Sequence, residues 1–327
     1  MINIDDILLA KSARRFGANG SDLKLIGGFS NNVFECRSDS GNYILKYYLS
    51  TNYEKESIES ELEWILYLFK SGVNVTVPLP SISGNMLEVV QLNNKEECWI
   101  VAFEKARGNF VNVSDKGEWN SDTFYRWGKT LGKIHCLSKR YKPINRKDWN
   151  SGLLFSEANN VSEEISRKWD MYINKLEKLP KDKNNYGMIH NDLHHKNFYI
   201  NKKELILFDF GDCEYNWFVY DIAIVLYHAL QTINENDLQA RRDFALQFTN
   251  SFLKGYKTEN HVDSSWLMEI PFFLNYRQIY SYMYFSKYLT EEQKSKGRIK
   301  EALNSMKVKI ENDIPYLEIQ LNRIFEG

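Results

Sequence analysis

The stretch that decides the fold begins with His190-Asn191-Asp192-Leu193-His194-His195-Lys196-Asn197. After a short apolar run it ends with Asp209-Phe210-Gly211-Asp212. A phosphoryl-transfer site uses such groups in this order, because one carboxylate orients the attacking hydroxyl while an amide and a second carboxylate hold Mg²⁺ on the nucleotide phosphates. The run from Leu205 to Phe208 predicts a buried strand that delivers Asp209 at its tip.

The pattern resembles the catalytic core of the protein-kinase-like small-molecule kinases, which include aminoglycoside phosphotransferases, choline kinases and one type of homoserine kinase. By this resemblance Asp192 is the catalytic aspartate, Asn197 and Asp209 are the Mg²⁺ ligands, and His190 supports the loop. The alternative is a chance match in a polar loop between two strands. The flanking strands and the second motif argue against it.

The chain departs from the family pattern in two places. Asn191 stands where glycine is usual, and His195-Lys196 stand where Pro-Gly is common. Asparagine tolerates left-handed backbone better than most other non-glycine residues, so Asn191 is a mild departure. Lys196 places a positive charge beside the predicted metal site, and the sequence assigns it no role.

Residues 23–48 predict three strands joined by two turns, a Gly-Gly turn and an Asp-Ser-Gly-Asn turn. In a kinase the first turn lies over the nucleotide phosphates, so Gly28 and Ser30 are candidate nucleotide-binding residues. Lys46 is a lone charge inside an apolar strand and matches the lysine that contacts the α- and β-phosphates. A Gly-Gly pair alone is weak support, because many hairpins carry one.

The next segment, residues 52–70, has apolar side chains at helical spacing and Gly72 just past its end. Such a helix supplies the glutamate that pairs with the strand lysine, and Glu59, Glu61 and Glu63 are available. Adjacent members of this set lie about 200° apart on a helix of 3.6 residues per turn, so they cannot share a face. We choose Glu61, because its spacing to Leu68 and Gly72 resembles the family pattern best. The alternative is that all three glutamates are solvated charges on the helix surface.

The predicted strand 97–103 runs into Glu104 and Ala106, which by resemblance form the hinge and bond adenine through their backbone. Composition then shifts from strands to helices. We therefore expect an α+β, bilobal protein-kinase-like fold. Residues 1–104 would form a small antiparallel-sheet N-lobe that binds nucleotide, and residues 105–327 a larger, mainly helical C-lobe for catalysis and acceptor binding.

The C-terminal part is predicted to be helical and aromatic-rich. A helix over residues 121–138 carries His135, which we interpret as a core residue, and Asp221 resembles a structural aspartate. The chain reaches Asp221 within twelve residues of Asp209, so it lacks the long activation segment of protein kinases. This argues for a small-molecule acceptor.

Composition is consistent with a cytoplasmic enzyme. The 327 residues suffice for two lobes, and a net charge of −1 indicates neither a nucleic-acid nor an anionic-membrane partner. No apolar run approaches the ~20 residues of a membrane span. The four cysteines are scattered without CxxC spacing, as expected of reduced thiols.

The sequence thus predicts transfer of the γ-phosphoryl group of ATP, with GTP as the alternative nucleotide and with Mg²⁺, to a hydroxyl of a small molecule. The acidic residues Asp212, Glu214 and Glu269 and the aromatic run 272–288 favour a cationic acceptor of the aminoglycoside or amino-alcohol type, whereas Arg277 in the cleft would favour a carboxylate-bearing one such as homoserine. The alternatives are a non-catalytic nucleotide-binding, coat or scaffold protein on the same fold, a sugar kinase and a protein kinase.

Overall fold

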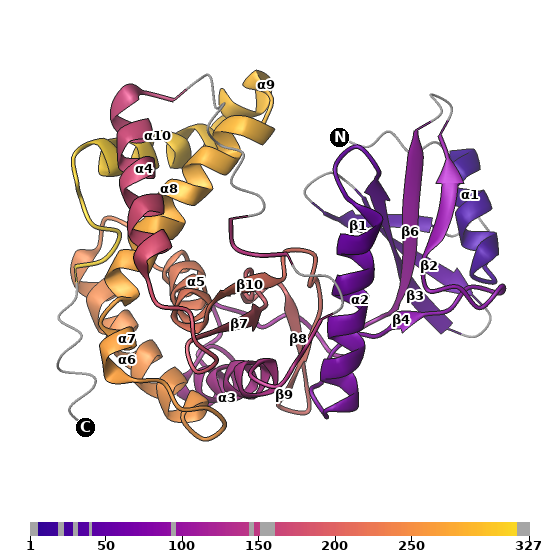
Figure 1. The fold of residues 1–327 in the computed structure, drawn as a ribbon, viewed down its shortest axis with the longest axis horizontal. Helices are drawn as coiled ribbons and strands as arrows, with labels where there is room; N and C mark the ends of the chain where they lie inside the picture. The colour runs from indigo at the N-terminus through magenta and orange to yellow at the C-terminus, as the bar shows by residue number, and fades with distance from the viewer. Residues whose placement is uncertain are drawn as a thin grey trace. The chain divides into compact units, whose positions relative to one another are not determined.

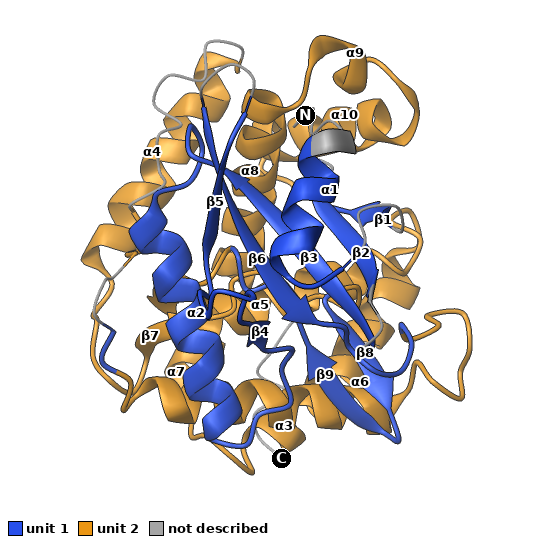
Figure 2. Cartoon of the chain, turned by 90° about the vertical axis from the view of Figure 1, so that its right-hand side faces the viewer, with its two compact units in different colours: residues 1–110, 142–146, 197–211 blue, residues 111–141, 147–196, 212–327 orange. Residues whose placement is uncertain are grey.

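A computed structural model describes residues 6–18, 23–28, 32–38, 41–92, 96–143, 147–150 and 161–318. The chain forms two compact units (Figure 2). The first comprises Met1–Phe110, Lys142–Arg146 and Asn197–Gly211, and the second comprises Val111–Tyr141, Lys147–Lys196 and Asp212–Gly327. Segments of the two units alternate along the chain. The division into lobes of residues 1–104 and 105–327 stays a prediction.

The first unit is built on an antiparallel sheet with the strand order β1-β2-β3-β6-β4, in which β5 also pairs with β6 (Figure 1). Along β2 the side chains alternate between the core and the opposite face, with Phe34 and Cys36 buried. Its sheet and helices are β1 (Leu23–Gly27), β2 (Val33–Ser38), β3 (Gly41–Leu49), β4 (Pro78–Leu79), β5 (Glu88–Gln91), β6 (Glu97–Glu104), α1 (Asp6–Arg15) and α2 (Lys55–Lys70). The hairpin of β8 (Phe198–Asn201) and β9 (Glu204–Leu207) belongs to this unit.

Helix α2 forms where the sequence predicts a helix. Its apolar residues recur every three or four positions, and Ile58, Leu62, Ile65 and Leu68 are buried along one stripe. The helix ends at Lys70, and Gly72 follows in the left-handed region with φ of 78°, as expected for a glycine just past a helix end. This stripe fixes the rotation of α2 and therefore the direction in which its glutamates point.

The second unit is mainly helical, and its described residues include a short antiparallel pair of strands. Its elements are α3 (Ser121–Ser138), α4 (Glu163–Lys178), β7 (Tyr186–Ile189), β10 (Glu214–Trp217), α5 (Phe218–Leu230), α6 (Leu238–Tyr256), α7 (Ser264–Leu267), α8 (Ile270–Tyr288), α9 (Glu291–Lys294) and α10 (Gly297–Glu311). Helix α5 is buried almost all round, which makes it the centre of this unit. None of the helices in the described part of the chain is long and apolar enough to cross a membrane.

Glycines let helices α3 and α6 approach closely. A Cβ added to Gly128 would lie 1.9 Å from the carbonyl oxygen of Phe252, and one added to Gly132 would lie 2.5 Å from that of Tyr256. From the facing helix, a Cβ on Gly255 would lie 1.9 Å from the carbonyl oxygen of Tyr125. The two backbones are therefore in direct contact, because only glycine leaves enough room.

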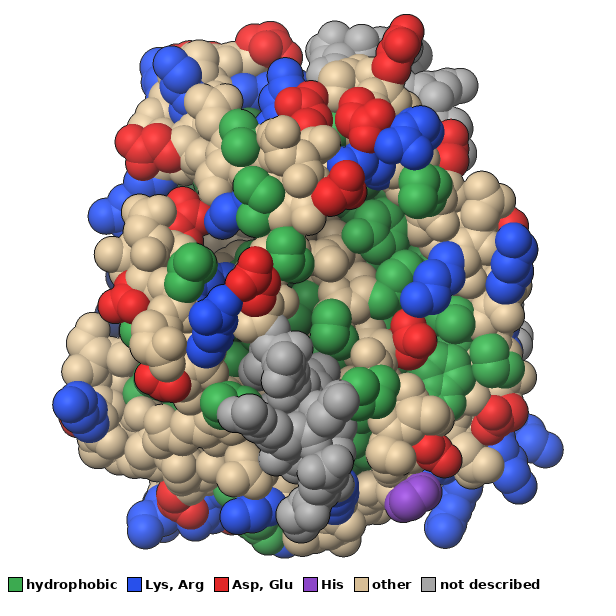
Figure 3. All heavy atoms as spheres, turned by 90° about the vertical axis from the view of Figure 1, so that its left-hand side faces the viewer, with side chains coloured by type: hydrophobic (Ala, Val, Ile, Leu, Met, Phe, Trp, Pro, Cys, Tyr) green, Lys and Arg blue, Asp and Glu red, His purple; other side chains and the backbone are tan. Residues whose placement is uncertain are grey.

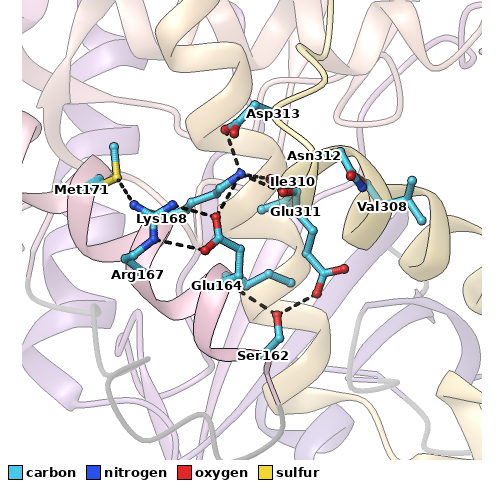
Figure 4. Close-up of polar contacts among 11 residues, drawn as sticks. Ser162, Glu164, Arg167, Lys168, Met171, Val308, Ile310, Glu311, Asn312 and Asp313 are labelled. Atoms are coloured by element: carbon cyan, nitrogen blue, oxygen red, sulfur yellow. Dashed lines mark hydrogen bonds and ion pairs between the residues drawn. The ribbon is translucent and has the colours of Figure 1, made fainter.

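A buried lysine joins helix α4 to the end of helix α10 (Figure 4). Nζ of Lys168 donates to the backbone carbonyls of Ile310 and Glu311 at 2.7 and 3.0 Å, and it lies 2.8 Å from Oδ1 of Asp313. These bonds satisfy carbonyl groups that a helix end leaves without intrahelical partners. A pocket of about 300 Å³ adjoins this contact between α4, α8 and the segment after α10, and neither Asp192 nor Arg277 is among its lining residues.

The surface is mixed in character on the face drawn in Figure 3, which lies to the left in Figure 1. Acidic and basic side chains are interspersed over it, with hydrophobic side chains between them. This mixture agrees with the formal net charge of −1 for the whole chain.

Candidate active site

The first unit brings together Lys46 on β3, Glu61 on α2 and Asp209 after β9. Nζ of Lys46 lies 2.8 Å from Oδ1 of Asp209 and 3.8 Å from Oε1 of Glu61. Burial by itself would lower the pKa of Lys46, but the carboxylate of Asp209, with Tyr48 and Glu61, raises that pKa well above its ordinary value. Lys46 is therefore a partly buried ammonium group that is held in its charged form.

The structure distinguishes the three glutamates of α2. Glu61 is buried and accepts a hydrogen bond of 3.2 Å from the hydroxyl of Tyr48, besides its contact with Lys46. Glu59 instead pairs with Lys55, one turn earlier on the exposed face, at 3.2 Å. Glu63 is half-buried. Of the three glutamates, Glu61 is thus the one that faces Lys46, which is the arrangement that the family resemblance implies.

Asp209 sits in a strained backbone conformation just after strand β9. The predicted strand is present one residue earlier than the run Leu205–Phe208, with Leu205 and Leu207 buried, and Asp209 has φ of +62°, which is uncommon for a residue other than glycine. A Cβ added to the neighbouring Gly211 would lie 2.8 Å from Nζ of Lys46. Glycine at this position therefore keeps room for the lysine beside the carboxylate.

Asn197 lies beside the same strand end. Its side chain is buried, and its backbone carbonyl accepts a hydrogen bond of 3.0 Å from the backbone N–H of Phe208. Amide and carboxylate oxygens are ligands that Mg²⁺ accepts, so Asn197 and Asp209 fit a divalent cation by their donor chemistry. Among the described residues no group of three or more His, Cys, Asp and Glu side chains gathers to form a further metal site.

The glycine turn of the first unit is described in part. Gly28 has φ of +89°, and a Cβ there would lie 2.1 Å from Oδ1 of Asn32. Asn32 is itself held by a hydrogen bond of 2.7 Å from its Nδ2 to the carbonyl of Tyr47. Position 28 therefore requires glycine. Ser30, the other candidate in this turn, lies outside the described residues.

The two candidate hinge residues follow strand β6. Glu104 is its last residue, and its backbone N–H donates to the carbonyl of Val77 at 2.9 Å. A bond from adenine to Glu104 would therefore go to its carbonyl oxygen. Ala106 lies two residues further on, in irregular backbone.

In the second unit, Asp192 is surrounded by basic side chains from three elements. Oδ1 lies 2.9 Å from Nη2 of Arg277 on α8 and 3.4 Å from Nε2 of His228 on α5, while Oδ2 lies 3.5 Å from Nε2 of His194. Burial alone would raise the pKa of Asp192, but its contact with His228 and the charge of Arg277 hold that pKa well below its usual range. Asp192 is thus a fixed carboxylate anion.

The loop that carries Asp192 is anchored by a buried aspartate. Oδ2 and Oδ1 of Asp221 accept hydrogen bonds of 3.0 Å from the backbone N–H groups of His190 and Asn191. Asn191 has φ of +67°, so the left-handed conformation expected where the family has glycine is confirmed. Asp221 also contacts Nε2 of His135 at 3.0 Å, and burial lowers the pKa of this histidine. His135 is therefore a structural residue of the core.

The acidic residues expected near the acceptor occupy different environments. Glu214 is buried, and burial raises its pKa to about 8 although Nδ2 of Asn216 donates to it at 2.8 Å. Asp212 is exposed, while Glu269 pairs with Lys175 at 2.8 Å. Glu214 is therefore a buried carboxyl group that a cation would stabilise in its charged form.

The sequence does not predict the place of two neighbours of Asp192. It indicates Arg277 only as a partner for an acidic acceptor, yet the guanidinium of Arg277 is directed at Asp192 and also lies 5.5 Å from the ring of Tyr280. For His228 the sequence gives no signal. Both side chains reach Asp192 because of the way in which α5 and α8 pack, and no local sequence motif indicates that packing.

Comparison with known proteins defines the class. A family model described as the phosphotransferase enzyme family matches residues 22–256, and the chain belongs to this family. An amicoumacin kinase from Bacillus subtilis (strain 168) is 34% identical over 325 residues, which cover 95% of this chain and 93% of that protein. The predicted family resemblance and fold class are confirmed, and the chain is a phosphotransferase of the kind that acts on small-molecule hydroxyls.

Solved structures of related kinases have the same fold as this chain. An amicoumacin kinase in complex with AMP-PNP, Ca²⁺ and Ami is 28% identical and superposes with a TM-score of 0.89, covering 98% of this chain and 97% of that one. A microcompartment-associated aminopropanol kinase is 18% identical, with a TM-score of 0.73 and coverage of 94% and 95%, and so shows the fold. A choline kinase from Streptococcus pneumoniae is 13% identical with a TM-score of 0.60 and coverage of 94% and 98%.

Proposed function

We propose that this phosphotransferase moves the γ-phosphoryl group of ATP to a hydroxyl of an amine-bearing small molecule related to amicoumacin. The observation that carries the proposal is the presence of Lys46, Asp192, Asn197 and Asp209 in a chain that matches an amicoumacin kinase over 95% of its length. We further propose that it works in the cytoplasm, where the scattered cysteines stay reduced.

The first unit supplies the residues that we assign to the nucleotide. Asn197 and Asp209 would hold Mg²⁺, which when bound neutralises charge on the phosphates. Lys46 would contact the phosphates, kept in position by Glu61 at 3.8 Å. Gly28 and Ser30 belong to the loop over the phosphates, and the backbone of Glu104 and Ala106 would bond the base. GTP is the alternative nucleotide.

The second unit supplies the residue that we assign to the acceptor. Asp192 would accept a hydrogen bond from the reacting hydroxyl and aim its oxygen at the γ-phosphorus, and it remains ionised because Arg277 lies 2.9 Å away. In-line transfer then forms the new O–P bond as the bond to the β-phosphate oxygen breaks. Asp192 gains the hydroxyl proton late, when the oxygen has become acidic.

Two features favour an amine-bearing acceptor. Glu214 is a buried carboxyl group whose pKa of about 8 would fall on contact with an ammonium group. The guanidinium of Arg277 is paired with Asp192 at 2.9 Å, which makes it a poor partner for the carboxylate of a homoserine-like acceptor. The residues that line the acceptor site are proposed from these environments.

An acceptor panel tests the proposal. The purified protein is incubated with Mg²⁺ and ATP or GTP, and ADP or GDP release is followed by a coupled assay with amicoumacin, 1-amino-2-propanol, choline, kanamycin and homoserine. We expect ATP turnover with amicoumacin above the level with water alone, and none for Asp192→Asn. Turnover with homoserine alone would overturn the amine proposal, and nucleotide binding without any turnover would favour a non-catalytic protein.

A further inference from the structure

A chain of hydrogen bonds runs from a half-buried lysine at the C-terminal end of α3 to the aspartate that anchors the catalytic loop. Nζ of Lys139 donates to Oδ1 of Asn260 at 2.5 Å, and Nδ2 of Asn260 donates to the hydroxyl of Tyr256 at 2.8 Å. That hydroxyl lies 2.8 Å from Nδ1 of His135, whose Nε2 lies 3.0 Å from Oδ2 of Asp221. The chain thus connects α3, α6 and α5 within the second unit.

The lysine fixes the direction of the first two hydrogen bonds. Burial lowers the pKa of Lys139, but the side chain is only half-buried and remains an ammonium group at neutral pH. An ammonium group only donates, so the amide oxygen of Asn260 faces Lys139 and the amide NH₂ faces Tyr256. The oxygen of Tyr256 therefore accepts a hydrogen bond from Asn260.

The hydroxyl proton of Tyr256 then fixes the tautomer of His135. Tyr256 is fully buried, so its proton needs an acceptor, and among the described residues Nδ1 of His135 is the acceptor within reach. Burial lowers the pKa of His135, which favours a neutral ring with a single proton. With Nδ1 as the acceptor, that proton is on Nε2, which donates to Oδ2 of Asp221.

Every donor in the chain therefore points the same way, from the ammonium group of Lys139 to the carboxyl group of Asp221. Hydrogen bonds aligned in this manner polarise and strengthen one another. Asp221 passes the effect to the catalytic loop, because its two oxygens also accept from the backbone N–H groups of His190 and Asn191 at 3.0 Å.

Packing holds the two rings of the chain in place. The ring of His135 stacks on Phe218 with ring centroids 4.5 Å apart and meets the ring of Tyr256 at 5.6 Å. Gly132 allows this approach of α3 and α6, since a Cβ there would lie 2.5 Å from the carbonyl oxygen of Tyr256. The imidazole therefore keeps Nε2 on the side of Asp221.

We propose that Lys139, Asn260 and Tyr256 are positioning residues that set the tautomer of His135 and thereby the conformation of the catalytic loop. The inference rests on the proposed phosphotransferase function, because this loop carries Asp192. A ring with its proton on Nδ1 would turn a lone pair towards Oδ2 of Asp221 and weaken the anchor. Asn191, with φ of +67°, depends on that anchor to hold a conformation that is costly for a residue other than glycine.

The main test is Asn260→Asp, which replaces a donor by an acceptor at nearly constant shape. Tyr256 would then donate to the new carboxylate, and Nδ1 of His135 would have to donate to Tyr256. The ¹⁵N signals of labelled histidine report the outcome directly. We expect a neutral His135 ring protonated on Nε2 in the wild type, and a ring protonated on Nδ1 in Asn260→Asp.

Hydrogen exchange and kinetics connect the tautomer to the loop. In Asn260→Asp the backbone amides of His190 and Asn191 should exchange faster than in the wild type, while those of α10, which lies outside the chain of hydrogen bonds, should be unchanged. With Mg²⁺, ATP and the best acceptor of the panel, kcat should fall by roughly ten- to a hundredfold, because Asp192 is displaced, and the KM for ATP should stay the same.

Lysine substitutions supply the controls. Lys139→Met removes the first donor and should lower kcat by a smaller factor, whereas Lys139→Arg keeps a donor and should restore it. Lys129→Met is the matched control, because Lys129 also joins α3 to the segment after α6, through Glu259 at 3.7 Å, but lies outside the chain of hydrogen bonds. It should change neither the amide exchange nor kcat.

The outcomes separate the positioning role from the overall function. An Asn260→Asp protein with His135 still protonated on Nε2 alone, or with wild-type kcat and loop exchange, would overturn the positioning role and leave the phosphotransferase function in place. If Asn260→Asp does not fold, Lys139→Met decides, and wild-type kcat and exchange in that variant would overturn the role. A wild type without turnover on any acceptor would overturn the proposed function, while the histidine signals and loop exchange still decide the positioning role.

Discussion

Arg277 Nη2 donates a hydrogen bond of 2.9 Å to Oδ1 of Asp192 and so joins helix α8 to the loop of the candidate catalytic aspartate. The arginine is largely buried, and burial alone would lower its pKa, yet Tyr220 and Asp192 keep that pKa above its ordinary value. Both partners are therefore held in their charged forms. Two consequences, for stability and for chemistry, can be measured separately.

Replacing Arg277 with glutamine should destabilise the protein, because Asp192 would be left charged and largely desolvated. Removing one partner of a buried pair costs on the order of 3 kcal/mol. The loss should be about as large at pH 5 as at pH 7 and should shrink only as the pH falls below about 4. The pKa of Asp192 is depressed in the folded state, so its contribution to stability is fully present above the unfolded pKa and is lost as pH falls from there through the folded pKa. Urea unfolding of both proteins at neutral pH and at pH values below about 4 measures this difference.

Arg277→Lys is the matched control, since it keeps the charge but not the planar fork. We expect its stability to lie between those of the wild type and Arg277→Gln. Equal stability of all three proteins at pH 7 would mean that the contact with Asp192 contributes nothing to the folded state.

Substitutions of Asp192 and Asp209 should impair different steps. Asp192→Asn should lower kcat by about a hundredfold or more and leave nucleotide affinity unchanged. Asp209→Asn should weaken binding of the Mg²⁺–nucleotide complex itself, because it removes a proposed metal ligand. Titration calorimetry with AMP-PNP, with and without Mg²⁺, together with turnover, distinguishes them. Near-wild-type turnover by Asp192→Asn would show that the role assignment is wrong.

Substitutions of Lys46 and Glu61 should weaken nucleotide binding and turnover to different extents. Lys46→Ala should reduce both nucleotide affinity and turnover strongly. Glu61→Gln should cost less, because Lys46 keeps its contact of 2.8 Å with Asp209. Metal binding would draw Asp209 away, so the effect of Glu61→Gln on affinity should grow when Mg²⁺ is present.

Glu59→Gln is the control for Glu61→Gln on the same helix. Glu59 pairs with Lys55 at 3.2 Å on an exposed face. Removing the charge of Glu59 should therefore leave both nucleotide affinity and turnover unchanged. If Glu59→Gln and Glu61→Gln had equal effects on the affinity for AMP-PNP, the link between Glu61 and Lys46 would be excluded.

Acid should unfold the protein partly through His194. Its folded pKa of about 4 lies below the value of about 6.5 for an exposed histidine. The unfolded chain therefore binds a proton that the folded one does not, and stability falls as pH drops from 6.5 towards 4. His194→Asn should make the free energy of unfolding fall less steeply over this range, as measured by urea unfolding at several pH values. If the free energy of unfolding of His194→Asn fell with pH as steeply as that of the wild type, the pKa of His194 would not be lowered in the folded protein.

Much of the fold follows from local sequence signals. The apolar spacing of α2, the strand before Asp209 and the left-handed backbone at Asn191 are set by residues close together in the chain, and each was predicted. The choice of Glu61 also rests on local geometry, since helical rotation separates it from its neighbours. The role of these residues with nucleotide remains a prediction.

The surroundings of Asp192 could not be predicted in the same way. Arg277 and His228 lie on α8 and α5, and their approach depends on how two long helices pack around the loop. Helical periodicity identifies a buried face, but it does not give the rotation and translation that bring one side chain to a particular oxygen. The tautomer of His194 is likewise set by a backbone contact, since its Nδ1 accepts a hydrogen bond from the N–H of Lys196.

The last prediction concerns the glycine contact between α3 and α6. Alanine is normally favoured over glycine inside a helix by about 1 kcal/mol. Gly128→Ala should nevertheless destabilise the protein by about 1–3 kcal/mol, because overpacking must move a backbone carbonyl that would lie 1.9 Å from the new Cβ. Gly117→Ala, whose Cβ would meet only the side chain of Asp115, is the control and should change little. Thermal unfolding measures both, and a Gly128→Ala protein as stable as the wild type would show that the two helices separate at little cost.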